Sequence, residues 1–535
     1  MRSQADAEPH RSGFARLDRW WGVVFAAFTA LFACVAVTLA LNKPFWHDEI
    51  YTILFADLPS LGTMWRAAHD GIDLAPPFNA MLTHGVHALT GVGPLSTRLP
   101  ALVGYWTMSL VVFDLVRRRS HVVAAVSAAI LPCLTEAFRY AIEARGYGAM
   151  LGLFALAVWA WSEAARDRNR ALMLPLLALA LAAGLWNQYF SVLALVPIGI
   201  GEALRLFRRR AVDWRVSAAI GAGVAGAWPL RGLMRVAASH ASTYWRHARV
   251  SDIGPTFLFL FEPLLTTPVI VASALALLFV VASAIQRQRA AVHADYSHLP
   301  AYEVGAGLGA LAVPAAAVLL GVYGAGAFAP RYALAGVMGM SVVLPLAIAR
   351  AGSRRGAADM LLATALVATF CGSAYRALVT ERQSYRDPMD ARPLLVEQLR
   401  QGETVVVSGP TEYLQLWYYA PVELRSQLVY LADPIAALHG LGSDTVDRNY
   451  LALRRSSSVP VFEYDHFMAS HRSFQVYEVG RGWLLERLKA SGAAFDEIGR
   501  EADGPLYRVR MPPPSSGRGS APSRCAPPRR PSSRC

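Results

Sequence analysis

Two neighbouring acids stand directly after the first long apolar stretch of the chain. The segment from Lys43 to Tyr51 reads KPFWHDEIY and holds Asp48 and Glu49. Carboxylates at a membrane surface are costly unless they have a function or a cation partner, and one within reach of a hydroxyl can act as a general base. The alternative is structural, with Asp48 capping a helix that ends at Ala56 and Glu49 in its first turn, where the helix dipole favours acids. The local sequence leaves both open.

A second polar cluster, FRYAIEARGYG, covers residues 138 to 148 before another apolar stretch. Glu143, Arg145 and Tyr147 stand here around Gly146. A guanidinium can bind a phosphate, and a glycine lets the backbone approach a ligand closely. The alternative is an ordinary belt of Tyr and Arg at a membrane surface, which is the commoner explanation for such a cluster by itself.

Two further arginines stand at the ends of apolar stretches. Arg98 lies in STRLP, and Arg331 is followed by Tyr332 in FAPRY. A single arginine in such a place is most often a snorkelling residue. If all these groups face one side of a membrane, however, they predict one site with a base and phosphate ligands.

The elements that must position these residues are membrane helices. The chain of 535 residues is 54% apolar and 17% charged, with a mean hydropathy of +0.33, which excludes an ordinary soluble protein. Stretches long enough to cross the membrane number about eleven. They lie near residues 20–41, 97–116, 121–137, 146–163, 172–187, 189–206, 216–235, 257–286, 303–323, 331–350 and 358–376.

The first of these stretches is expected to stay in place as an anchor. It follows Arg11, Arg16 and Arg19 and is longer than the roughly 7 to 15 apolar residues of a signal peptide. The five cysteines show no metal-ligand spacing and no obvious pairing. A net charge of +13 does not indicate nucleic-acid binding, because the tail after residue 511 supplies five arginines and no acid.

Arginine placement predicts the orientation of the spans. Arginine clusters fall in alternate connections, which the positive-inside rule assigns to the cytoplasm together with residues 1–19. These clusters lie near residues 117–119, 166–170, 205–210, 287–289 and 350–355. The connections that then face outward are residues 42–96, 138–146, 236–256, 324–331 and everything after about 377. This assignment requires the stretch 75–91, with two prolines, Asn79, His84 and His87, to lie on the surface rather than cross.

The pattern changes after the last apolar stretch. Residues 381–511 alternate polar and apolar segments and predict a small α/β domain, with strands at TVVVS, QLVYLA and LYRVRM and helices at TEYLQLWYYA and WLLERLKASG. No phosphate-cradling or nucleophile motif accompanies it, so we expect an acceptor-side or structural lid. Residues 512–535 are rich in Pro, Ser and Arg, which is typical of a disordered tail.

The ordered set of motifs resembles the membrane glycosyltransferases of the GT-C type. The set consists of DE after the first anchor, a polar helix with PP, then RLPA, EARGY and PRY. It is most similar to the branch of protein mannosyltransferases and of bacterial transferases that decorate lipopolysaccharide, over roughly residues 15–375. The resemblance implies an all-α polytopic membrane bundle over residues 20–376, to which the pattern of residues 381–511 adds the small extracytoplasmic α/β domain.

The resemblance also implies roles for individual residues. It makes Asp48 the base or acceptor-orienting group with Glu49 beside it, and it carries substrate or phosphate contacts onto Arg98, Glu143, Arg145 and Tyr147. Arg331 and Tyr332 match the PRY element. The family often has His or Lys before the double proline, whereas Ala75 stands here. His69 and Asp70 lie upstream and are the candidates to substitute.

The activity that the resemblance implies is transfer of a sugar from a polyprenyl-phosphate carrier to an extracytoplasmic acceptor, with inversion at the anomeric carbon. Lipid A, lipopolysaccharide, another envelope glycan or a protein would be the acceptor, at the plasma (inner) membrane. We expect no required cofactor, a divalent metal ion as an option, and no nucleic-acid partner. The alternatives are a polymerase or ligase of lipid-linked oligosaccharides, a transporter or flippase for them, and a scaffold.

Overall fold

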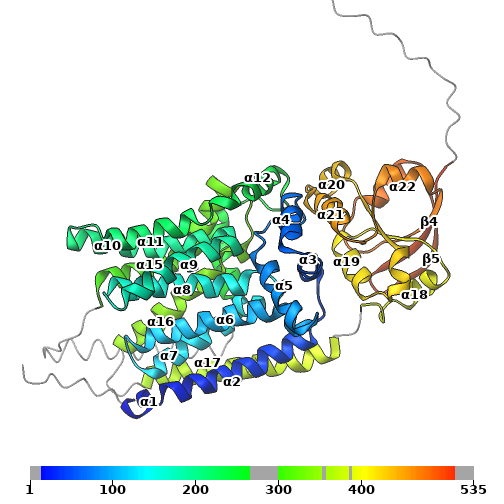
Figure 1. The fold of residues 1–535 in the computed structure, drawn as a ribbon. Coiled ribbons are helices and arrows are strands. Elements are labelled where there is room, and N and C mark those ends of the chain that lie inside the picture. Colours follow the sequence, from blue (N-terminus) through cyan, green and yellow to red (C-terminus); the bar gives the residue numbers. More distant parts are fainter. Residues whose placement is uncertain (1–13, 265–298, 352–356, 385–387, 513–535) are drawn as a thin grey trace, which may run out of the picture.

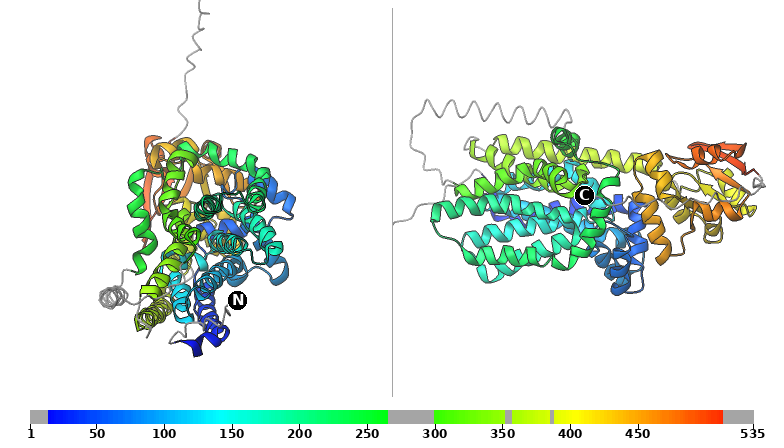
Figure 2. Two further views of the ribbon diagram at one scale, coloured as in Figure 1. Left: turned by 90° about the vertical axis from the view of Figure 1, so that its left-hand side faces the viewer. Right: turned by 90° about the horizontal axis from the view of Figure 1, so that it is seen from above.

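The protein is a helical bundle with an α/β domain at one end, as seen in a computed structural model (Figures 1 and 2). The structure describes residues 14–264, 299–351, 357–384 and 388–512. Both parts of the predicted fold class are therefore confirmed.

Eight helical segments are long and apolar enough to cross a membrane within the described ranges. At 1.5 Å per residue, a segment of 18 or more residues reaches about 27 Å, close to the thickness of the hydrocarbon core. Each matches one of the predicted spans. They are α2 (Trp21–Asn42), α6 (Pro94–Arg117), α8 (Tyr147–Ala165), α9 (Arg170–Asn187), α10 with the 3-10 turn before it (Tyr189–Arg209), α15 and the turn after it (Ala301–Ala325), α16 with the turn before it (Pro330–Arg350), and most of α17 (Ala357–Val379 of Ala357–Ser384).

The other three predicted spans differ from straight helices. The stretch 121–137 is a helix pair, Val122–Leu134 and Glu136–Ile142, bent by 75° at Thr135, and it gives a ninth span if it counts as one. The stretch 216–235 is divided into α11 (Trp214–Ala225) and α12 (Arg231–Ser239), because Gly226 and Pro229 interrupt the helix. Of the stretch 257–286, only the beginning, with α13 (Ile253–Phe261), falls in the described residues.

Glycines bring α6 and α8 into backbone contact. A Cβ on Gly104 would lie 2.4 Å from the Cα of Ala149, and one on Gly152 would lie 2.4 Å from the carbonyl oxygen of Gly104. Small residues allow such close packing of membrane helices. The contact fixes the beginning of α8, where Arg145 stands, against the beginning of α6, where Arg98 stands.

Three short helices connect α2 to α6 beside the α/β domain (Figure 1). They are α3 (His47–Ala56), α4 (Leu61–His69) and α5 (Phe78–Thr90). With 13 residues α5 is not among the candidate spans, and His84 makes a 2.7 Å hydrogen bond to the Ala56 carbonyl at the end of α3. The stretch 75–91 thus packs on neighbouring short helices, as the predicted orientation requires.

The α/β domain contains a six-stranded sheet in the order β3-β2-β1-β4-β6-β5. The first four strands in this order are parallel, and β6 runs antiparallel to both β4 and β5. All five elements predicted in this region are confirmed. Those are β1 (Val405–Val407), α19 (Pro410–Tyr419), β2 (Leu428–Ala432), α23 (Leu484–Ala490) and β6 (Gly504–Arg510). The remaining elements are α18 (Pro393–Arg400), α20 (Pro434–Leu441), α21 (Thr445–Ser456), β3 (Val461–Glu463), α22 (Tyr464–Ser470), β4 (Ser473–Tyr477) and β5 (Ala494–Glu501).

Arginines from the predicted cytoplasmic connections meet at the other end of the bundle. Glu303, at the start of α15, pairs with Arg119 at 2.9 Å and also with Arg166. Arg350 donates to the Arg119 carbonyl at 3.1 Å. Arginine clusters from separate connections therefore gather at the end opposite the α/β domain (Figure 1).

Candidate active site

The loop between α2 and α3 is built around a buried ion pair. Glu49 and Arg98 are both 0% exposed, and Arg98 donates to the two carboxylate oxygens at 2.7 and 2.8 Å. Glu49 also accepts from the backbone N–H of Ala144 at 2.8 Å and, more weakly, from that of Trp46 at 3.4 Å. The pair thus joins the first loop, the start of α6 and the second loop.

Every N–H of the Arg98 guanidinium has a partner within the protein. Besides the two bonds to Glu49, it donates to the carbonyl oxygens of Ala40, Lys43 and Pro44. The guanidinium also lies 4.7 Å from the centre of the Phe45 ring. Arg98 therefore organises the loop, and no donor is left for a bound phosphate.

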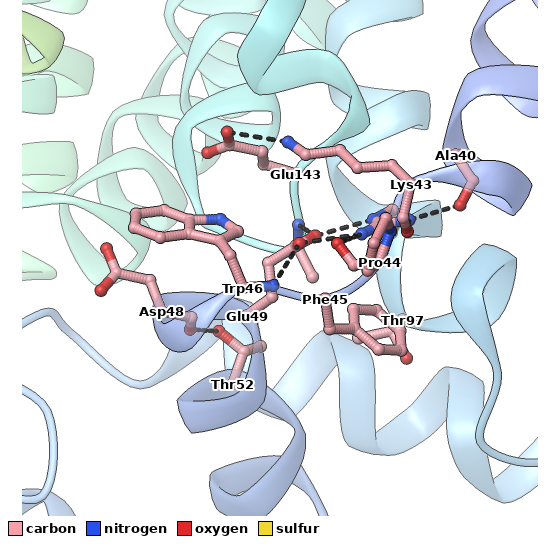
Figure 3. Close-up of polar contacts among 12 residues, drawn as sticks. Ala40, Lys43, Pro44, Phe45, Trp46, Asp48, Glu49, Thr52, Thr97 and Glu143 are labelled. Atoms are coloured by element: carbon pink, nitrogen blue, oxygen red, sulfur yellow. Dashed lines mark hydrogen bonds and ion pairs between the residues drawn. The ribbon is translucent and has the colours of Figure 1, made fainter. Parts of the chain in front are cut away.

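Asp48 stands beside Glu49 in the first turn of α3 but faces the other way. Figure 3 shows its side chain directed away from that of Glu49. Asp48 is 22% exposed and its carboxylate lies 4.0 Å from Arg331 and 3.2 Å from the Nδ1 atom of His47. Burial alone would raise its pKa, but the hydrogen bond with His47 and the charges of Arg145, His47 and Arg331 hold the pKa well below its usual value. Asp48 is thus a reachable, ionised carboxylate.

Two arginines face this carboxylate from different elements. Arg145, directly before α8, donates to Asp73 at 2.8 Å and to the Asp48 carbonyl at 3.4 Å. Arg331 is the second residue of the 3-10 helix Pro330–Gly336 before α16, and it lies near the rings of Tyr147, at 5.9 Å, and Trp245, at 5.6 Å. Its Nε atom is buried without a hydrogen-bond partner among the described residues. The first N–H groups of α8 lack partners within the helix, so its N-terminus adds a positive end to the same region.

Glu143 joins two loops rather than facing the arginines. Its carboxylate accepts from Lys43 at 3.0 Å and from Arg139 at 3.2 Å, and its side chain is 1% exposed.

The predicted aromatic residues, Tyr147 and Tyr332, pack against each other beside the site. The rings of Tyr147 and Tyr332 stack at 6.4 Å, and Tyr332 stacks on Phe190 at 4.7 Å.

The structure does not bring His69 and Asp70 to the arginines. Both are exposed at the end of α4, and the Nδ1 atom of His69 is bonded to the Trp65 carbonyl. The acid beside Arg145 is instead Asp73, which sequence reasoning missed. The nearby double proline was the available signal, because it marks the turn that directs residues 73 to 77 back to the site.

A narrow pocket with amide side chains adjoins Asp73 and Arg145. Asn79, Asn187 and Gln188 line it, and the Oδ1 atom of Asn187 is buried without a partner in the part of the chain that the structure describes. Sequence reasoning had not placed these amides, or Trp245, at the site. Their side chains converge from α5, from the end of α9 and from the connection near residue 245, and no local motif joins them.

An apolar groove lies next to this pocket. Its lining comes from α5, α6 and α8 and includes Leu82, Leu99, Val103, Leu153 and Leu156. Along α8 it runs from Ala149, close to Arg145, toward the middle of the span. Neighbouring residues of α5 and α8 line the pocket and the groove, so a surface suited to a hydrocarbon chain lies near the polar site.

No group of three or more His, Cys, Asp or Glu side chains suited to a metal ion occurs among the described residues. The predicted option of a divalent ion thus has no clustered protein ligands in these ranges.

Comparisons with known proteins agree with this architecture. Residues 75–227 match the family model described as dolichyl-phosphate-mannose-protein mannosyltransferase. The fold matches the crystal structure of ArnT from Cupriavidus metallidurans in the apo state, with 12% identity, a TM-score of 0.58 and coverage of 92% of this chain and 98% of that one. It also matches the same protein bound to undecaprenyl phosphate, at 12% identity and a TM-score of 0.55 over 90% and 98% of the two chains. No curated protein matches the sequence. The predicted resemblance to the GT-C type is confirmed.

Proposed function

We propose that this chain, a membrane protein with the fold of the GT-C glycosyltransferases, transfers a sugar from a polyprenyl phosphate to an acceptor hydroxyl. The observation that carries the proposal is the position of Asp48, an accessible carboxylate facing Arg145 and Arg331 beside an apolar groove. The ArnT structure with bound undecaprenyl phosphate supports a lipid-phosphate donor.

In the proposed reaction Asp48 takes the proton of the acceptor hydroxyl as its oxygen attacks the anomeric carbon. The bond from that carbon to the phosphate oxygen breaks, and the carrier leaves as polyprenyl phosphate. Arg145, Arg331 and the N-terminus of α8 stabilise the charge that grows on the leaving phosphate. Glu49 and Arg98 hold the loop without touching substrate. Attack opposite the leaving phosphate inverts the anomeric configuration.

Donor binding also prepares the base. In the free protein the two arginines help to keep the pKa of Asp48 low, which makes it a weak base. A bound phosphate takes up part of their positive charge, so the pKa of Asp48 rises toward the range where proton transfer is efficient.

The amide side chains beside Asp73 and Arg145 are the proposed hydrogen-bond partners of the sugar. Amide groups both donate and accept hydrogen bonds, as sugar hydroxyls do. The apolar groove would hold the first part of the carrier chain. With arginine clusters at the opposite end of the bundle, the positive-inside rule favours a site on the extracytoplasmic side of the plasma (inner) membrane.

The test is transfer by purified protein supplied with a panel of polyprenyl-phosphate sugars and with lipid A, envelope glycan or protein acceptors. Wild type should release free carrier phosphate, and Asp48→Asn should lower kcat by roughly 10²- to 10⁴-fold. The matched control is Asp465→Asn, because that carboxylate is 87% exposed on the α/β domain.

Two results would reject the proposal. One is release of carrier phosphate at the same rate in wild type and Asp48→Asn. The other is movement of labelled lipid across a vesicle membrane with no donor consumed, which would favour a transporter.

A further inference from the structure

The segment that leads from α2 into the first turn of α3, where Asp48 stands, does not satisfy its own backbone hydrogen bonds. Residues 44 to 46 have no regular secondary structure between α2 and α3, and Phe45 is only 4% exposed. A buried peptide group needs hydrogen-bond partners. At Phe45 both partners come from the α/β domain, about 370 residues later in the chain.

Helix α19 supplies these partners. The backbone N–H of Phe45 donates to the Tyr419 hydroxyl at 2.6 Å, and the side-chain amide of Gln415 donates to the Phe45 carbonyl at 3.1 Å. The Tyr418 ring meets the Phe45 ring edge-on at 5.9 Å. Since Arg98 also contacts the Phe45 ring, the residue is held between the membrane bundle and α19.

Helix α21 makes a second contact on the other side of Asp48. The Tyr450 ring lies 6.0 Å from that of His47 and 5.7 Å from that of Tyr51. The Tyr450 hydroxyl donates to the carbonyl of Pro410, the first residue of α19. The two contacting helices are thus joined to each other, and they touch the chain before and after Asp48.

We propose that the α/β domain is a positioning element for the reaction, in which Tyr419 and Gln415 fix the two peptide groups on either side of Phe45 and thereby direct Asp48 toward Arg331. This inference rests on the proposed role of Asp48 as base. The two α19 side chains touch no reacting atom. They act through the backbone at Phe45, three residues before Asp48, and catalysis is sensitive to displacements of about 1 Å in a reacting group such as this carboxylate.

The experiment compares wild type with the double variant Tyr419→Phe/Gln415→Ala in the full-length protein. Hydrogen–deuterium exchange of peptides covering residues 43–50 should become about tenfold faster, because the loop loses two hydrogen bonds. The kcat for sugar transfer should fall about tenfold, while the KM for the donor stays the same, since the phosphate ligands are untouched.

Tyr413→Phe is the matched control. It removes a tyrosine hydroxyl that donates to the Pro460 carbonyl at 2.8 Å, entirely within the α/β domain. It should leave both the exchange of residues 43–50 and kcat unchanged. The inference is overturned if the double variant exchanges like wild type, or if Tyr413→Phe produces the same changes.

The two proposals can fail separately. If wild type consumes no polyprenyl-phosphate sugar, the proposed function fails, whereas the exchange measurement still decides whether α19 holds the loop.

Discussion

The two faces of the loop at residues 43–49 place neighbouring carboxylates in opposite surroundings. On one face Glu49 is fully enclosed and bonded at 2.7 and 2.8 Å to Arg98, whose donors are all used. On the other face Asp48 and Arg331 are 22% and 23% exposed and lie 4.0 Å apart. A closed pair stabilises structure, whereas an open pair leaves charge for a ligand. The two acids carry the same chemical group, and it is the packing around each that gives them different roles.

The largest expected effect comes from breaking the closed pair. Arg98→Ala leaves the buried Glu49 charge without its cation and takes a hydrogen-bond donor from three carbonyl groups, so we expect a loss of roughly 3–5 kcal/mol in folding free energy. Folded yield and Tm in detergent measure it. Glu49→Ala should be similarly harmful, while Asp48→Asn should keep the wild-type Tm. A wild-type Tm for Arg98→Ala would contradict the structural role of the pair.

A change on the open face should affect activity and leave folding intact. Arg331→Gln removes a cation that stabilises the leaving phosphate, so kcat/KM for the donor should fall about 10²-fold. The variant also removes a charge that favours the ionised form of Asp48, so the acidic limb of the pH–rate profile should move to higher pH.

The control for this prediction is Arg231→Gln, because Arg231 is exposed over Trp228 on α12. It should leave both the rate and the pH profile unchanged. An unshifted acidic limb in Arg331→Gln would argue against Arg331 as the neighbour of the base.

A third carboxylate, that of Asp447, extends the comparison to a buried acid without a cation in the described parts of the chain. Its expected effect, on Tm, is the smallest of the three. Asp447 in α21 is buried and has no ion pair with a cation among the described residues, and burial raises its pKa to about 7. The folded state then holds a proton that the unfolded state has lost above about pH 4, so Asp447 reduces folding stability as pH rises to 7. Relative to Asp447→Asn, the wild-type Tm should fall by a few degrees between pH 5 and 8.

Asp48 offers the contrast for this measurement. Its pKa lies below its usual value, so it is ionised in both states between pH 5 and 8. The difference in Tm between wild type and Asp48→Asn should therefore stay constant between pH 5 and pH 8. A flat Tm difference for Asp447→Asn would mean that this group is ionised in the folded protein.

The predictable part of the fold follows from local pattern. Eight of the predicted spans were confirmed because an apolar run of 18 or more residues has few alternatives to crossing a membrane. The predicted spans 121–137 and 216–235 are not straight helices in the structure, because each contains helix-breaking residues. Their high apolar content made the breaks hard to recognise in the sequence. The five predicted elements of the α/β domain were confirmed because apolar residues recur at different spacings in strands and in helices, so the sequence distinguishes the two.

The site was predictable only in part. Asp48, Arg145 and Arg331 were found because each stands at the end of a span, where a charged residue is conspicuous in the sequence. Asp73 and Asn79 flank the double proline, but this motif did not indicate which of its neighbours reach the site, and Asn187 and Gln188 come from a segment without a motif. The link from α19 to Phe45 joins positions about 370 residues apart, which no local pattern can indicate.

By itself the sequence determined the membrane bundle, its arginine-rich connections and the residue types gathered near one surface, because hydropathy and charge act through the local chain. Only the tertiary structure decided which carboxylate is enclosed by Arg98 and which stays open to Arg331, since that choice depends on the packing of α6, α8 and α19 around one loop.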